Sequence, residues 1–121
     1  MMFNKALLFN DRAIADQILK TRAPRDMKQL GREVKGFSEH VWNVNREHII
    51  LQGNKYKFSQ HPPLHAALLA TRGTTLVESS PHDSIWGIGL RDDDPRALNR
   101  STWKGLNLLG KTLTQLRDGW N

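Results

Sequence analysis

Residues 74–89 read Thr-Thr-Leu-Val-Glu-Ser-Ser-Pro-His-Asp-Ser-Ile-Trp-Gly-Ile-Gly, and this stretch decides the predicted fold class. Its first part, Thr74–Glu78, is short and rich in β-branched side chains, a pattern that predicts a strand. From Ser79 to Gly105 the sequence is rich in Gly, Pro, Asp and Ser, which indicates a long loop. Loops of that length in a compact domain are usually functional or mobile. We therefore expect a short strand that delivers polar side chains into a functional loop.

Most of the remaining sequence has the apolar spacing of helices. Ser38 is a good N-cap for the longest predicted helix, which runs toward Phe58 and carries a buried stripe that includes Val41 and Ile49. The last helix is predicted over residues 106–117. We expect a mainly helical α+β fold with a small sheet, in a single domain over residues 1–121.

Composition removes several classes of site. The 121 residues include no cysteine, which excludes disulfides, thiolate metal sites and thiol nucleophiles. The histidines show no metal-ligand spacing and no Walker loop or dinucleotide fingerprint occurs, so we predict no metal and no cofactor. No apolar run approaches the roughly 20 residues that span a bilayer, and we expect a soluble cytoplasmic protein.

The chain is basic, with eighteen Lys and Arg against twelve Asp and Glu and a formal net charge of +6. The basic residues are spread along the sequence, and no zinc-finger or other nucleic-acid-binding motif appears. This charge fits a phosphorylated small-molecule partner or a solvated surface, and nucleic acid is the less favoured partner.

Two carboxylates and an indole stand close together in the quoted stretch. Glu78 and Asp83 offer groups that hold or activate water and stabilise an oxocarbenium-like state, and Trp86 offers a flat face for a base or ribose. These are the tools of glycosidic bond cleavage. An alternative remains open, in which Glu78 caps a backbone group, Asp83 makes an Asx-turn and Trp86 is a core residue.

A second group of candidate residues surrounds the start of the last helix. Trp103 and Lys104 precede Gly105, Asn107 and Gly110. Glycines near a helix start let a phosphate approach the backbone, and helix N-termini favour anions. The Asn107 amide is suited to bond a ligand or, equally, to cap the helix.

The motifs taken in order resemble the NADAR, or YbiA-like, family over nearly the whole chain. This resemblance implies a mainly helical α+β fold and an N-glycosidase that hydrolyses phosphorylated ribosyl pyrimidines of riboflavin biosynthesis. Other relatives in the family act on ADP-ribose attached to a nucleobase. The segments that carry the resemblance are residues 5–9, 57–60, 76–78, 83–89 and 103–110.

The resemblance also implies roles for individual residues. It assigns catalysis to two carboxylates, with Asp83 polarising water or stabilising charge at the anomeric carbon and Glu78 beside it. Two tryptophans would stack the base, two lysines would attract the phosphate, and a glycine and an asparagine would complete the substrate site. These substrate-binding residues are Trp42, Trp86, Lys57, Lys104, Gly87 and Asn107. From its position alone, Trp42 is by default a core residue of the long helix.

The resemblance departs from the family pattern at the front of the chain. Family members begin with a strand and a Glu-His-Tyr-like stretch whose glutamate belongs to the active site, and that stretch would lie before Met1. We therefore expect an N-terminally shortened domain. Two alternatives to an enzyme stay open. One is a nucleotide- or ADP-ribose-binding module without hydrolysis, and the other is an interaction protein or nucleic-acid binder that uses the basic surface.

Overall fold

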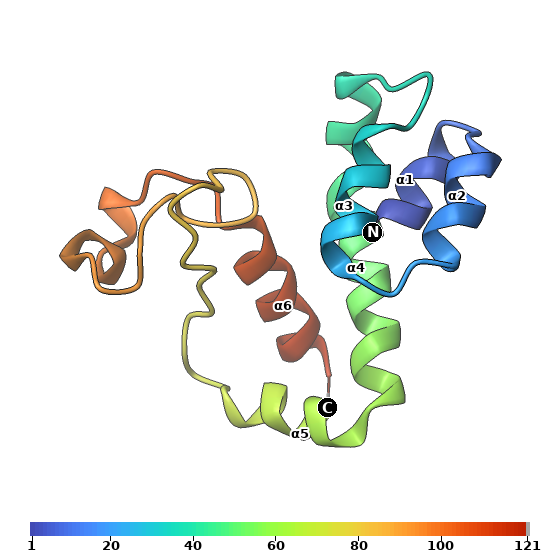
Figure 1. Cartoon of the computed structure of the whole chain (residues 1–121). Coiled ribbons are helices and arrows are strands. Elements are labelled where there is room, and N and C mark those ends of the chain that lie inside the picture. The colour runs from blue at the N-terminus through green and yellow to red at the C-terminus, as the bar shows by residue number, and fades with distance from the viewer. Residues whose placement is uncertain (121) are drawn as a thin grey trace. The chain divides into compact units, whose positions relative to one another are not determined.

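The computed structural model describes residues 1–120, which fall into two compact units. The first unit is Met1–Ile49 and the second begins at Ile50. Figure 1 shows the helices along the chain. They are α1 (Met2–Leu8), α2 (Arg12–Leu19), α3 (Pro24–Arg32), α4 (Glu39–Gln60), α5 (Pro62–Ala70), η1 (Pro95–Leu98), η2 (Arg100–Thr102) and α6 (Leu108–Gly119).

The first unit is a cluster of short helices, α1 to α3, packed around small and aliphatic side chains. The Asp11 carboxylate links two parts of this unit. Its Oδ1 accepts the Ile14 N–H at the start of α2, and its Oδ2 accepts the Lys35 N–H after α3. These two backbone donors hold the pKa of Asp11 below its ordinary value. The buried core consists of Ala6, Ile14, Ala15, Ile18 and Val34.

Helix α4 begins in the first unit and ends in the second. The Ser38 hydroxyl accepts the Val41 N–H, as predicted for the N-cap. The predicted buried stripe on this helix is wrong, because none of its residues is buried and Val44 is 68% exposed. The physical reason is the spacing of the apolar residues. Consecutive residues of a helix point in directions about 100° apart, so the run Ile49–Leu51 spreads around the helix instead of forming one face.

The predicted strand at Thr74–Glu78 is wrong, and with it the α+β fold class. Residues 1–120 contain helices, turns and irregular segments but no strand and no sheet. The segment is uncoiled, as the yellow trace in Figure 1 shows. Its backbone groups bond to a side chain and to a loop. The Asn107 side chain donates to the Leu76 carbonyl and accepts the Glu78 N–H, and the Glu78 carbonyl accepts the Ile88 N–H at 3.0 Å. A strand needs a second backbone beside it, and a single side-chain amide supplies only one donor and one acceptor to this segment.

Helix α6 closes the second unit. The buried Arg117 guanidinium donates to the Thr71 carbonyl at 2.9 Å, which ties α6 to the end of α5, and it also pairs with Asp118. None of the helices within residues 1–120 has the length and apolar character needed to cross a bilayer. The buried aliphatic residues of this unit are Leu68, Ile88, Leu90, Leu108 and Leu116.

Candidate functional site

Asp83 forms a tight turn with the residues that follow it. Its Oδ1 accepts the N–H groups of Ile85 at 3.0 Å and of Trp86 at 2.8 Å. This is the Asx-turn that the sequence left open as an alternative. The turn uses one carboxylate oxygen, and no hydrogen bond to Oδ2 is found within residues 1–120. The half-buried carboxylate is therefore fixed in direction while one oxygen stays available to a ligand or a water.

Gly87 brings the backbones of Glu78 and Asp83 together. A Cβ at Gly87 would lie 2.9 Å from the carbonyl oxygen of each, so only glycine fits between them. Within residues 1–120, the half-buried carboxylate of Glu78 makes no hydrogen bond. The backbone of Glu78 is held on both sides, by Asn107 and by Ile88. Gly87 thus brings together the backbones of the two residues that carry the predicted catalytic carboxylates.

Asn107 is the buried connector of this region, with 2% of its surface exposed. Its Oδ1 accepts the Glu78 N–H at 3.0 Å, and its Nδ2 donates to the Leu76 carbonyl at 3.0 Å. Its own N–H donates to the Gly87 carbonyl at 2.9 Å. The residue adopts the left-handed conformation, with φ of 52°, immediately before α6, and its side chain does not cap that helix. The amide thus supports the segment that carries Glu78.

The lysines predicted to attract phosphate lie on the surface. Lys104 is exposed, its N–H donates to the Ile88 carbonyl at 2.9 Å, and its charge is one of the smaller causes that lower the pKa of Asp94. Lys57, near the end of α4, is exposed and its ammonium lies 5.6 Å from the ring centroid of Phe58. Lys104 therefore contacts the backbone of Ile88, two residues beyond Trp86, whereas Lys57 shares none of these contacts.

Trp42 belongs to the first unit and is half-buried there. The ammonium of Lys5 lies 5.6 Å from the Trp42 ring centroid and 4.7 Å from that of Phe37, and it donates to the Gly31 carbonyl at 2.7 Å. Burial and the nearby Arg32 lower the pKa of Lys5. Trp42 is thus part of a cation–π cluster within its own unit.

The second unit contains a cavity of about 430 Å³. Of the residues to which the resemblance assigns a role, Asn107 lines it, and of the second candidate group Trp103, Gly105 and Gly110 line it as well. Its notable side chains are two cations, Arg100 and Lys111, and the indole of Trp103. Arg100 and Lys111 stand in no recognisable motif, and only the folding of residues 74–76 against 100–114 brings them together.

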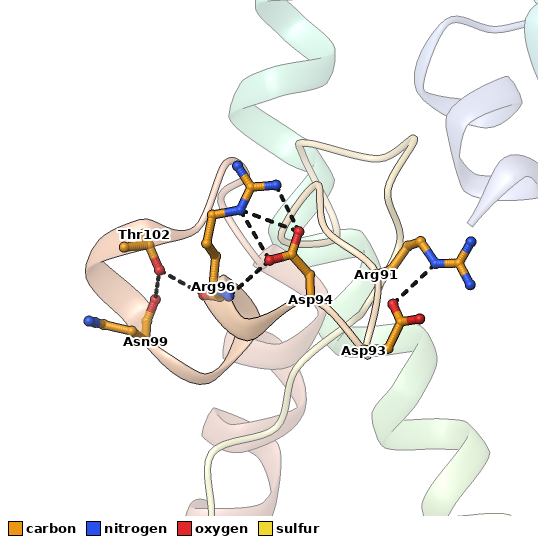
Figure 2. A network of polar contacts seen from close by, with 6 residues as sticks. All are labelled: Arg91, Asp93, Asp94, Arg96, Asn99 and Thr102. Atoms are coloured by element: carbon orange, nitrogen blue, oxygen red, sulfur yellow. Dashed lines mark hydrogen bonds and ion pairs between the residues drawn. The ribbon is translucent and has the colours of Figure 1, made fainter.

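A network of polar contacts holds the loop that leads into this cavity, as Figure 2 shows. The Asp94 carboxylate accepts from the guanidinium and the backbone N–H of Arg96, and these bonds lower the pKa of Asp94 to about 2. The Thr102 hydroxyl contacts the carbonyl oxygens of Arg96 and Asn99. The loop before Trp103 is therefore ordered by its own side chains. The described part of the chain contains no group of three or more His, Asp and Glu side chains that could hold a metal ion.

Comparison with known proteins confirms the family resemblance. The model of the NADAR domain matches residues 1–120. N-glycosidase R617 of Acanthamoeba polyphaga mimivirus is 42% identical over 118 residues, which cover 98% of this chain and 69% of that protein. Protein irg-1 of Caenorhabditis elegans is 42% identical over 119 residues, which cover 97% of this chain and 56% of that protein.

A plant relative has a name that refers to a pathway. The chloroplastic riboflavin biosynthesis protein PYRR of Zea mays is 37% identical over 110 residues, which cover 88% of this chain and 16% of that protein. The chain therefore spans between about a sixth and about two thirds of the length of these relatives. Because the family model matches residues 1–120 and the mimivirus protein is 42% identical over nearly the whole chain, the chain belongs to the NADAR family.

Proposed function

We propose that this protein is an N-glycosidase that hydrolyses the bond between ribose and a base. Its substrate is either a phosphorylated ribosyl pyrimidine of riboflavin biosynthesis or an ADP-ribosyl-linked base. The activity is supported by family membership and by the name of the mimivirus relative, and the pathway by the name of the maize relative. The observation that carries the proposal is the Asp83 carboxylate, held through one oxygen beside Trp86 with the other oxygen unbonded within residues 1–120.

The proposed reaction needs water as its only co-reactant. The bond between the anomeric carbon and the nitrogen of the base breaks, the electron pair leaves with the base, and positive charge develops on the sugar. The Asp83 carboxylate stabilises that charge and accepts a proton from the water whose oxygen bonds to the anomeric carbon, and that proton passes to the nitrogen of the leaving base. Glu78, whose backbone carbonyl lies against Gly87 as that of Asp83 does, supplies the second carboxylate. The products are the free base and a free sugar phosphate or ADP-ribose.

The remaining predicted residues bind the substrate in this proposal. Trp86 stacks on the base, and Lys57 and Lys104 attract the phosphate. Gly87 keeps the backbones of Glu78 and Asp83 close together, and Asn107 fixes the segment that presents Glu78. We further propose that both units belong to one NADAR domain over residues 1–121, as the match to the family model over residues 1–120 supports. The proposed location is the cytoplasm, because a phosphorylated substrate does not readily cross a membrane.

The substitution Asp83→Asn tests the proposal. Asparagine keeps an oxygen in the position of Oδ1 and so preserves the turn, but it removes the charge. We expect the turnover rate to fall by roughly 10²–10⁴-fold, as for the loss of an acid–base group, with little change in the melting temperature. The assay incubates the protein with ribosylaminouracil phosphate, or with an ADP-ribosylated nucleobase, and measures the free sugar phosphate or ADP-ribose by chromatography.

Asp93→Asn is the matched control, because that exposed carboxylate pairs only with the exposed Arg91. The control is expected to retain the wild-type rate. A wild-type rate in Asp83→Asn would refute the role of Asp83. Binding of these substrates by the wild type without release of sugar, detected as a thermal shift, would instead establish the non-catalytic nucleotide-binding module.

A further inference from the structure

We propose that the hydroxyl group of Thr75 is a phosphorylation site, and that Arg100 and Lys111 bind the phosphoryl group once it is attached. Thr75 is exposed and belongs to the uncoiled segment that leads to Glu78. Surface segments without regular structure are more mobile than helices, so a modifying enzyme reaches them more easily. The modifying enzyme is a second protein, and the proposal therefore does not depend on the proposed hydrolysis.

The first argument is the free hydroxyl group of Thr75. Three threonines line the cavity of the second unit, and the hydroxyls of Thr74 and Thr114 each donate to a backbone carbonyl. The Thr75 hydroxyl oxygen lies 3.4 Å from Nη2 of Arg100, and no acceptor for its hydrogen is found within residues 1–120. Phosphorylation replaces that hydrogen with a phosphoryl group. At Thr75 the replacement breaks no hydrogen bond that the hydroxyl donates, whereas at the other two threonines it would.

The second argument is a pair of cations without a counter-charge. Arg100 and Lys111 line the same cavity as Thr75, and among the described residues no Asp or Glu lines it. Neither cation forms an ion pair within residues 1–120. A phosphothreonine carries a charge of about −1.5 to −2 and three strong acceptor oxygens. A phosphoryl group on Thr75 would start from an oxygen that already contacts Arg100, and would therefore compensate positive charge at this cavity.

The third argument is that Arg100 is held in place before any modification. Its guanidinium carbon lies 5.6 Å from the ring centroid of Trp103, and the Trp103 Nε1 in turn donates to the Ala97 carbonyl at 2.8 Å. A cation that is already ordered loses less conformational freedom when it binds an anion. A bond from Arg100 to the phosphoryl group would therefore order the segment at Thr75, which continues to Glu78.

The sequence before Thr75 suits one class of kinase. Arg72 lies three residues before Thr75 and is exposed. Protein kinases select substrates partly by charge pattern, and an arginine at this position fits a kinase with an acidic substrate groove. The Arg72 guanidinium donates to the Trp120 carbonyl at the surface, and a carboxylate of the kinase can replace that carbonyl as the acceptor.

The reaction transfers the γ-phosphoryl group of ATP to Oγ1 of Thr75. The bond between the γ-phosphorus and the oxygen that bridges it to the β-phosphorus breaks, and ADP leaves with the electron pair. The bond between phosphorus and Oγ1 forms, and the hydroxyl proton passes to the catalytic aspartate of the kinase.

The first test incubates the full chain with magnesium, ATP and the catalytic subunit of cyclic-AMP-dependent protein kinase, which selects arginine before the acceptor. Mass spectrometry then locates the phosphate. We expect phosphate on Thr75 in the wild type and in Thr74→Val, and a rate that falls by about tenfold or more in Arg72→Gln. A folded wild type that takes up no phosphate at Thr75, or takes it up on Thr74 instead, would overturn the proposal.

The second test measures the melting temperature of the phosphorylated protein. Phosphate on Thr75 is expected to raise it by roughly 4 °C in the wild type and by less than about 1 °C in Arg100→Gln. Arg91→Gln is the matched control, because that exposed arginine does not line the cavity, and it should keep the wild-type shift. An equal shift in Arg100→Gln and the wild type would refute the binding of the phosphoryl group by Arg100. Neither test uses a glycosidase substrate, so failure of the proposed hydrolysis would leave both results unchanged.

Discussion

The amide of Asn107 holds the uncoiled segment that carries Glu78, and its removal gives a quantitative test of that architecture. Asn107→Gly deletes both side-chain bonds, to the Leu76 carbonyl and the Glu78 N–H, while glycine adopts the left-handed backbone easily. Asn107→Ala deletes the same bonds and in addition replaces asparagine, which tolerates the left-handed region, with a residue that tolerates it poorly. The difference between the two variants therefore isolates the backbone contribution.

The expected magnitudes follow from these contacts. Two hydrogen bonds, each contributing about 0.5–1.5 kcal/mol, predict that Asn107→Gly lowers the free energy of unfolding by about 2 kcal/mol. Alanine in the left-handed region costs about 1–2 kcal/mol, a penalty that glycine avoids and asparagine largely avoids, so Asn107→Ala should lower the free energy of unfolding by about 3–4 kcal/mol. Losses of this size are a large fraction of the roughly 5–15 kcal/mol that stabilise a domain.

Urea denaturation followed by far-UV circular dichroism measures these changes, and hydrogen exchange reports on the Glu78 amide directly. In the wild type the Glu78 N–H is bonded to Asn107 and should exchange slowly. In Asn107→Gly it should exchange much faster. An unfolding free energy within about 0.5 kcal/mol of the wild type, together with a protected Glu78 amide, would refute the role assigned to this side chain.

Two further predictions concern packing and pH. Gly105→Ala should lower the free energy of unfolding by at least about 1–3 kcal/mol, because the new Cβ would lie 2.9 Å from the carbonyl carbon of Ile88. In the control Gly53→Ala the new Cβ meets no atom within 4 Å, and this variant should raise the free energy of unfolding by about 0.5–1 kcal/mol. Thermal denaturation compares the two, and equal melting temperatures would contradict the close approach at Gly105. The pKa of Asp94 lies at about 2, below its ordinary value of 3.8, so its contribution to stability is complete above pH 3.8 and is lost as the pH falls through about 2. The stability difference between the wild type and Asp94→Asn should therefore shrink as the pH falls toward about 2 in chemical denaturation, and a difference that does not vary with pH would argue against the Asp94–Arg96 bonds.

The sequence determined the features that depend on near neighbours. Ser38 caps α4 and Asp83 makes a turn because each side chain bonds to backbone within three residues. The last helix was predicted over residues 106–117 and is found at Leu108–Gly119, since Asn107 turns into the left-handed region just before it. The order of the motifs also determined the family, because that order is a property of the sequence itself.

Only the tertiary structure decided the fold class and the cavity. Local preference suggested a strand at Thr74–Glu78, but the bonding partner of this segment is the Asn107 amide, 31 and 29 residues away from the two groups that it binds. In the same way, Arg100 and Lys111 line one cavity together with residues 74–76, which are distant from them in the sequence. Intrinsic preference acts over a few residues, whereas a strand and a binding cavity require partners that distant parts of the chain supply on folding.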